Sequence, residues 1–173
     1  MRRRLSLRPA EAVLQYGGAV LASPGMALER GFLQHGRVSV FEHSVQAAYV
    51  CAAWARALQV PVDGRSLVRG ALLHDYFLYD WHEKDAGHRL HGLHHARRAL
   101  KNARKQYRLS PIEANMIDSH MFPLNLRLPR YRESVLLCLA DKYCALRETL
   151  RLPCCAGARP LMRQPAPAED MPK

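Results

Sequence analysis

The stretch Leu67-Val68-Arg69-Gly70-Ala71-Leu72-Leu73-His74-Asp75 ends an apolar run on an adjacent imidazole and carboxylate. The run predicts a buried helix, and Asp63 is a suitable residue to cap its start. A His-Asp pair at the end of such a helix can supply two ligands to one metal ion if other segments supply more. The pair therefore indicates a metal site whose remaining ligands lie elsewhere in the chain.

Four candidate ligands lie on other segments. His43 lies upstream near the start of a long apolar stretch, and Asp141 lies downstream within 135–142. Between them fall His95 and His120. Each of these residues is on a separate predicted helix, so a bundle could bring all of them to one place.

Asp141 comes at the end of a long stretch, 134–140, that carries no charge. Helical spacing places Leu137 and Ala145 on its face, so we expect its carboxylate to point into the core. A buried carboxylate is costly unless it is paired, hydrogen-bonded or bound to metal. The alternative is a core aspartate that caps a neighbouring helix or pairs with an arginine. His43 and the His-Asp pair would then each need a separate explanation, which favours one shared metal site.

The order of His, then His-Asp, then Asp resembles the HD-domain superfamily of metal-dependent phosphohydrolases over roughly residues 30 to 150. The resemblance implies that four residues hold one metal: His43, His74, Asp75 and Asp141. Superfamily members with two extra histidines before the last Asp hold a second metal, bridged by the HD aspartate. Here that implies a second ion held by His95, His120 and shared Asp75.

His94 is the alternative to His95, because consecutive residues point in different directions at the start of a helix. The superfamily often has a His-x-x-x-Ala pattern here, which matches the segment 95–99 and favours His95. The proline that frequently follows this histidine is Ala96 in this chain.

Phosphate charge beyond the metals needs cations. Lys142 follows Asp141 and is the first candidate, expected to serve both catalysis and substrate binding, while Asp75 acts as the bridging ligand. His91 is expected to act as a general acid or to support a ligand. Further candidates for substrate binding are Lys84, Arg89, Arg130 and Arg132. The alternative for each cation is ordinary surface charge.

The chain is expected to be an all-α, single-domain helical bundle with the metal site between helices. Residues 1–29 are predicted to form an N-terminal arm and peripheral helix, 30–152 the HD phosphohydrolase domain, and 153–173 a disordered tail rich in Pro and Ala. Helices are predicted at 9–21, 40–60, 66–73, 94–108, 110–120 and 131–150, with a loop or lid at 76–92. No segment shows the alternation typical of a strand.

The net charge of +11 over 173 residues favours anionic partners. Four cations recur at helical spacing and form one basic face: Arg97, Lys101, Arg104 and Arg108. Such a face is usually only solvated; the functional alternative is that it gathers phosphate-bearing substrate. Nucleic-acid binding is less favoured, since no known recognition motif accompanies the charge. The apolar segment 19–22 is too short to span a bilayer, so a cytoplasmic protein without membrane contact is expected.

The five cysteines form no CxxC pair. Cys51, Cys138 and Cys144 lie in apolar helical runs and are expected to act as small hydrophobic residues. A zinc site built from Cys154, Cys155 and histidines is the alternative, although no paired spacing supports it.

The leading hypothesis is a phosphohydrolase that cleaves an ester or anhydride of a nucleotide or small phosphorylated metabolite with metal-activated water. Two divalent ions are expected, chosen from Mn, Fe, Co, Ni, Zn or Mg. One alternative is a non-catalytic nucleotide- or RNA-binding module that uses the basic helix 97–108. Another is oxidative chemistry at a di-iron site with the same ligands. The sequence leaves the substrate and the oligomeric state open.

Overall fold

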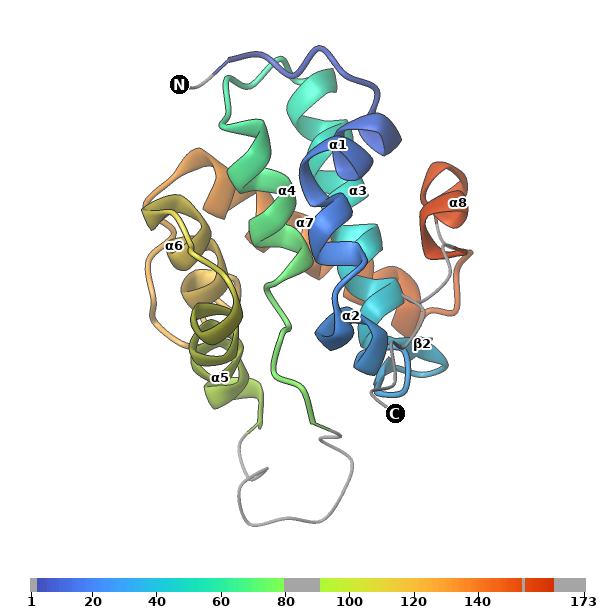
Figure 1. Cartoon of the computed structure of the whole chain (residues 1–173), viewed down its shortest axis with the longest axis vertical. Coiled ribbons are helices and arrows are strands. Elements are labelled where there is room, and N and C mark those ends of the chain that lie inside the picture. Colours follow the sequence, from blue (N-terminus) through green and yellow to red (C-terminus); the bar gives the residue numbers. More distant parts are fainter. Residues whose placement is uncertain (1–2, 80–90, 154, 164–173) are drawn as a thin grey trace, which may run out of the picture.

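Helices form nearly all of the regular secondary structure in the described part of the chain (Figure 1). The computed structural model describes residues 3–79, 91–153 and 155–163, with the backbone alone described at 35 and 91–93. The elements are α1 (Pro9–Leu21), α2 (Pro24–Leu28), β1 (Leu33–His35), β2 (Val38–Ser39), α3 (Val40–Ala57), α4 (Gly64–Leu72), α5 (His91–Gln106), α6 (Pro111–Ser119), α7 (Arg132–Thr149), the 3-10 turn η2 (Ala156–Ala158) and α8 (Arg159–Met162). The all-α prediction is confirmed.

The helix α4 lies in the middle of the bundle. It packs on α1 and α3 on one side and on α6 on the other, while α7 packs on α3, α4 and α6. Figure 1 shows α5 and α6 together on the side of α4 away from α1. Leu67, Val68 and Leu72 of α4 are fully buried among these neighbours. The segment that follows α4 therefore enters the interior, and that segment is His74-Asp75.

Local capping explains where α4 begins and ends. Asp63 is the N-cap, and its Oδ1 accepts a hydrogen bond of 2.8 Å from the Ser66 backbone N–H. The helix ends at Leu72, and the His-Asp pair follows in a turn closed by a 2.7 Å bond from Phe77 N–H to Asp75 C=O. The predicted cap at Asp63 and the burial of this helix are confirmed, and the helix ends one residue before the predicted end at 73.

The start of α3 carries a capping box. The Ser39 side chain accepts from the Glu42 N–H, and the Glu42 carboxylate accepts from the Ser39 N–H. The helix ends at Ala57, three residues before the predicted end at 60. Gln59 takes a left-handed conformation with φ 53°, and Val60 N–H bonds back to Ala55 C=O at 3.0 Å. This C-terminal motif stops the helix before Pro61 does.

The predicted start of α6 is confirmed, with Ser110 and Glu113 in a capping box and Pro111 at the first helical position. The α7 helix fits the predicted range with one residue less at each end. The α5 helix starts at His91, three residues before the predicted start. Residues 80–90 of the predicted loop or lid lie outside the described ranges.

A short hairpin was not predicted. β1 and β2 pair antiparallel around Gly36, whose φ is 62°. Strands of three and two residues are too short to show an alternating pattern, which is why the sequence gave no signal for them. The hairpin matters because it carries Gln34 into the interior.

The prediction of a disordered tail from 153 is wrong for its described part. Residues 156–162 form η2 and α8, which pack on α3, and Leu161 is buried to 2% exposure. Ala158 is also fully buried, and Cys155 and Met162 pack against the core, so the apolar residues of this segment are what order it. Residues 164–173 lie outside the described ranges. Within those ranges no helix is long and apolar enough to cross a membrane.

Candidate metal centre

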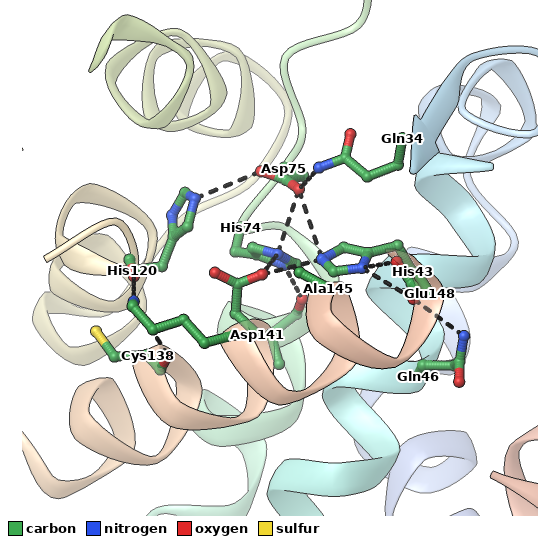
Figure 2. Close-up of polar contacts among 12 residues, drawn as sticks. Gln34, His43, Gln46, His74, Asp75, His120, Cys138, Asp141, Ala145 and Glu148 are labelled. Carbon is green, nitrogen blue, oxygen red and sulfur yellow. Dashed lines mark hydrogen bonds and ion pairs between the residues drawn. The ribbon is translucent and has the colours of Figure 1, made fainter. Parts of the chain in front are cut away.

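Six predicted ligands from five parts of the chain meet between the helices: His43, His74, Asp75, His95, His120 and Asp141. All six are buried, with exposed fractions from 0% to 8%. The first turn of α3, the end of α4, the body of α5, the C-cap of α6 and the middle of α7 each supply at least one of them. Figure 2 shows the Asp75 carboxylate with His120 on one side and His43 and His74 on the other.

The two oxygens of Asp75 face different groups of ligands. Its Oδ2 lies 3.4 Å from His74 Nε2 and 3.8 Å from His43 Nε2. Its Oδ1 lies 3.3 Å from His95 Nε2 and 3.5 Å from His120 Nε2. We call the first group, completed by Asp141, the first cluster, and the second group the second cluster. A carboxylate in this position can bridge two ions.

Asp141 completes the first cluster. Its Oδ1 lies 3.0 Å from His43 Nε2 and 3.7 Å from His74 Nε2. His120 lies near both clusters, since its Nε2 is also within reach of His74 and Asp141, and its ring stands edge-on to that of His74 at 4.9 Å. We place His120 in the second cluster because its Nε2 approaches Asp75 Oδ1 and lies 2.8 Å from the Nε2 of His95.

The orientation of the imidazoles fits a metal. Nδ1 of His43 contacts a Glu148 carboxylate oxygen at 2.9 Å, Nδ1 of His74 donates to Ala71 C=O at 2.8 Å, and Nδ1 of His120 donates to Ile117 C=O at 2.9 Å. When Nδ1 is the donor, the Nε2 lone pair is left for a metal. Among the described residues, none forms a hydrogen bond with His74 Nε2. The donor set of imidazole and carboxylate suits a first-row divalent ion.

Charge is balanced inside the first cluster. Burial works to lower the pKa of His43, but hydrogen bonds to Asp141 and Glu148 raise that pKa well above its ordinary value. Burial opposes a raised pKa in His74 as well, and the nearby carboxylates of Asp75 and Asp141 overcome it. Without metal, the two imidazoles are therefore held as cations among carboxylates.

The carboxylates respond in the opposite direction. Burial would raise the pKa of Asp75, but the charge of His74 and the nearby imidazoles of His120 and His95 hold it well below the ordinary value. The pKa of Asp141 is likewise lowered, because the nearby imidazoles of His43 and His74 outweigh its burial. In His120 burial dominates and lowers the pKa. The second cluster therefore keeps a neutral imidazole that is ready to bind metal.

The structure distinguishes the two candidate histidines at the start of α5. His95 is buried to 4% exposure and faces Asp75, whereas His94 is exposed. His91 is the first residue of α5, but its side chain lies outside the described part. Lys84 and Arg89 also lie outside the described ranges.

The predicted cations that are described lie at the surface. The Lys142 Nζ donates to His120 C=O at 3.1 Å and to Cys138 C=O at 3.2 Å, so its ammonium is held beside the backbone of a ligand. Arg130 and Arg132 are exposed, and the Arg130 N–H bonds to Asn115. None of these contacts brings a cation into the centre itself.

The cysteines take no part in the described centre. Cys51, Cys138 and Cys144 are free and buried in helices, as predicted. Cys155 is partly buried, and Cys154 lies outside the described ranges.

Sequence reasoning missed three residues that support the ligands. Glu148 accepts from His43 Nδ1, and Gln46 Nε2 donates to Glu148 at 3.1 Å. Gln34 Nε2 donates to Asp75 Oδ2 at 2.5 Å. Glu148 could have been found, because it lies two helical turns after Asp141 and so shares its buried face. Gln34 could not, since its place depends on the short hairpin.

Glu29, another missed residue, is the C-cap of α2 and is fully buried. Neither of its carboxylate oxygens has a hydrogen-bond partner among the described residues. Burial, reinforced by the charge of Asp75, raises its pKa well above the ordinary value. Glu29 is therefore held neutral, because an ionised carboxylate there would be unpaired.

The fold and the centre define a class of protein: a helical bundle that gathers His and Asp ligands from separate helices around a position for metal ions. The chain matches the HD domain family over residues 40–146, and it belongs to that family. This family is the HD-domain superfamily of metal-dependent phosphohydrolases. The match begins with α3 and ends within α7, so it spans the residues from His43 to Asp141. No curated protein and no solved structure matches the chain.

Proposed function

We propose that this protein hydrolyses a phosphate ester or anhydride of a nucleotide or another small phosphorylated metabolite, using two divalent metal ions. The observation that carries the proposal is the division of the Asp75 oxygens between two clusters, at 3.4 Å from His74 and 3.3 Å from His95. One carboxylate between two sets of imidazoles is the arrangement that a bridged two-metal site needs. Family membership supports the same reaction class.

Bound metal ions would polarise the phosphoryl group and lower the pKa of a coordinated water toward neutrality. His43, His74, Asp75 and Asp141 would hold the first ion, and His95, His120 and Asp75 the second. The donor set is compatible with Mn, Fe, Co, Ni or Zn, and its carboxylates also with Mg.

The chain's own residues fix the ligands in place. The Gln34 amide orients the Asp75 carboxylate, and Glu148 keeps the His43 proton on Nδ1 so that Nε2 faces the first cluster. Burial of all six ligands excludes bulk water, so electrostatic interactions in the centre are stronger than they would be at the protein surface. The Lys142 ammonium beside the His120 backbone offers a positive charge at the edge of the centre, where we propose that it meets substrate phosphate.

The test is hydrolysis together with metal content. Protein loaded in turn with Mn, Fe, Co, Ni and Mg is assayed against mono-, di- and cyclic nucleotides and dinucleoside polyphosphates. Asp75→Asn should lose both metals and all turnover, whereas His95→Ala should lose mainly the second metal. Asp118→Asn, on α6 outside the centre, is the matched control and should retain both. Full metal occupancy without turnover of any substrate would contradict the proposal.

A second candidate function is a non-catalytic module that binds nucleotide or RNA through the basic face of α5. The supporting observation is that Arg97, Lys101, Arg104 and Arg108 are all exposed, while each described acidic residue is at least partly buried. Such binding should weaken steeply with added salt and should survive Asp75→Asn. Metal-dependent turnover that Asp75→Asn abolishes would favour the hydrolase.

A further inference from the structure

A surface pocket of about 240 Å³ lies between the start of α5 and the loop that joins α6 to α7. Its lining residues combine basic, amide and apolar side chains: His94, Arg97, Leu124, Asn125, Leu126 and Arg127. None of these residues is one of the six ligands of the centre. The pocket is therefore a separate feature of the surface.

The pocket lies close to the second cluster along the chain. His94 precedes His95, and consecutive Cα atoms are about 3.8 Å apart. Leu124 follows His120 by four residues, and α5 packs directly on α6. The walls of the pocket therefore come from segments that also carry His95 and His120, two of the residues expected to hold the second ion.

The basic side chains of the pocket are available to a ligand. Arg97 and His94 are exposed and form no hydrogen bond or ion pair with the other described residues. Arg127 approaches one carboxylate, that of Asp118, at 3.9 Å, which is the outer limit of an ion pair. Two guanidinium groups that face one hollow match the oxygens of a phosphate, because each can donate two hydrogen bonds in a fixed fork.

The apolar wall is exposed. Leu124 is 56% exposed and Leu126 is 80% exposed. The turn that presents them is held by bonds from Asn125 Nδ2 to Asp118 C=O at 2.8 Å and from Arg127 N–H to Asn125 Oδ1 at 3.1 Å. Leucines held out into solvent beside two arginines suit a ligand with an apolar or aromatic part next to its phosphates.

We propose that this pocket binds a phosphate group of the substrate other than the one hydrolysed, with the leucines against the base or sugar. The substrate class is then a nucleotide that carries at least two phosphates. This inference rests on the proposed function for its biological meaning, but binding at the pocket can be measured without turnover. Phosphate is also a product of hydrolysis, so the test must separate nucleotide from free phosphate.

The experiment measures binding of ATP and of inorganic phosphate to the protein as purified, by calorimetry at fixed ionic strength. The test variant is Arg97→Ala with Arg127→Ala. The control is Arg56→Ala with Arg65→Ala, which removes the same charge from two exposed positions that do not line the pocket. All variants keep the metal ligands. The difference in ATP affinity between the test variant and the control variant therefore measures the contribution of the pocket.

We expect the test variant to bind ATP at least about tenfold more weakly, as two charge-assisted bonds are lost, and the control to change by less than about twofold. Leu124→Ala with Leu126→Ala should weaken ATP binding and leave inorganic phosphate unchanged. Equal losses in test and control, or ATP binding unaffected by either, would overturn the inference. A pocket selective for inorganic phosphate, with no effect of the leucines, would overturn the nucleotide assignment.

The two proposals can fail separately. ATP binding that depends on Arg97 and Arg127, in a protein that hydrolyses no substrate, would contradict the hydrolase and support the pocket. Nucleotide hydrolysis whose KM is the same in test and control variants would support the hydrolase and contradict the pocket.

Discussion

Replacing Glu148 by Gln tests how the first cluster prepares His43 for metal. The Glu148 carboxylate lies 2.9 Å from His43 Nδ1 and also accepts from Gln46. Gln keeps nearly the same shape and one oxygen acceptor but removes the charge. The charge-assisted bond becomes a neutral one, which is about half as strong.

The expected loss follows from that change. A charge-assisted hydrogen bond contributes about 1.5–3 kcal/mol and a neutral one about 0.5–1.5 kcal/mol, so the difference is about 1–2 kcal/mol. That difference corresponds to roughly 5-fold to 30-fold weaker metal binding, which overlaps the range of about 10–100-fold seen when such supporting partners are removed.

The loss should depend on pH. Glu148 also helps to raise the pKa of His43 in the metal-free protein, so metal must displace a proton that Glu148 stabilises. In the variant that proton leaves more readily. The gap in metal affinity between the native protein and Glu148→Gln should therefore be largest at high pH and narrow as the pH falls.

The assay is competition for metal against a chelator of known affinity, at pH 6, 7 and 8. Glu133→Gln is the control: Glu133 is buried on the same helix, but its carboxylate bonds to the Asp63 N–H away from the centre. Native metal affinity in Glu148→Gln at pH 8, or an equal loss in Glu133→Gln, would refute the positioning role of Glu148.

The two histidines of the first cluster have raised pKa values, so metal affinity should increase with pH, by up to about tenfold per pH unit for each proton displaced. Calorimetry in buffers of different ionisation enthalpy should count one or two protons released when metal binds. A count of zero would contradict this prediction. The pKa of Glu29 is raised in the folded protein, so the unfolded state binds fewer protons and stability falls as the pH rises above about 4.5. In chelator-treated protein, Glu29→Gln should therefore lose less stability than the native chain between pH 5 and pH 8 in urea unfolding, and parallel curves would show that the carboxylate is not held neutral. A Cβ at Gly25 would lie 1.5 Å from the Tyr76 Oη, so Gly25→Ala should cost about 1–3 kcal/mol and weaken metal binding by shifting the residue after Asp75. Gly18→Ala, which faces open space, is its control in thermal unfolding, and an equal effect of the two would rule out the Tyr76 contact as the cause.

The sequence predicted the helices and their ligands where local chemistry decides the outcome. Asp63 and Ser110 cap their helices as expected, because their side chains bond to backbone groups only three residues away. Asp141 is buried as its apolar neighbours on one helical face indicated. His95 rather than His94 faces the centre, as the pattern after it suggested.

Other features depend on contacts between distant residues and could not be read from local pattern. Gln34 reaches Asp75 across 41 residues, and only the fold of the short hairpin places it there. Leu161 helps to order a segment of the tail by finding a place in the core. The end of α3 was predicted at a proline, but a left-handed Gln59 stops it earlier. In each case tertiary packing or backbone geometry decides what composition leaves open.

The first cluster explains why metal and fold should depend on each other in this protein. Asp75, Asp141 and Glu148 are buried carboxylates, and His43 and His74 are the cations that offset them when no metal is bound. Burying these charges has a desolvation cost, and only close pairing between opposite charges offsets that cost. A divalent ion would replace the two imidazolium charges with one positive charge centre bonded to the same atoms, and each ligand would keep its supporting bond. Metal should therefore stabilise the fold by mass action, with the unfolding temperature rising as metal is added. Since the ligands come from α3, α4 and α7, the benefit would be spread over the helices that form the core, while the second cluster would tie α5 and α6 to them through Asp75. Asp75 thus contacts ligands of both clusters, and a change at Asp75 should affect the helices on both sides of the centre.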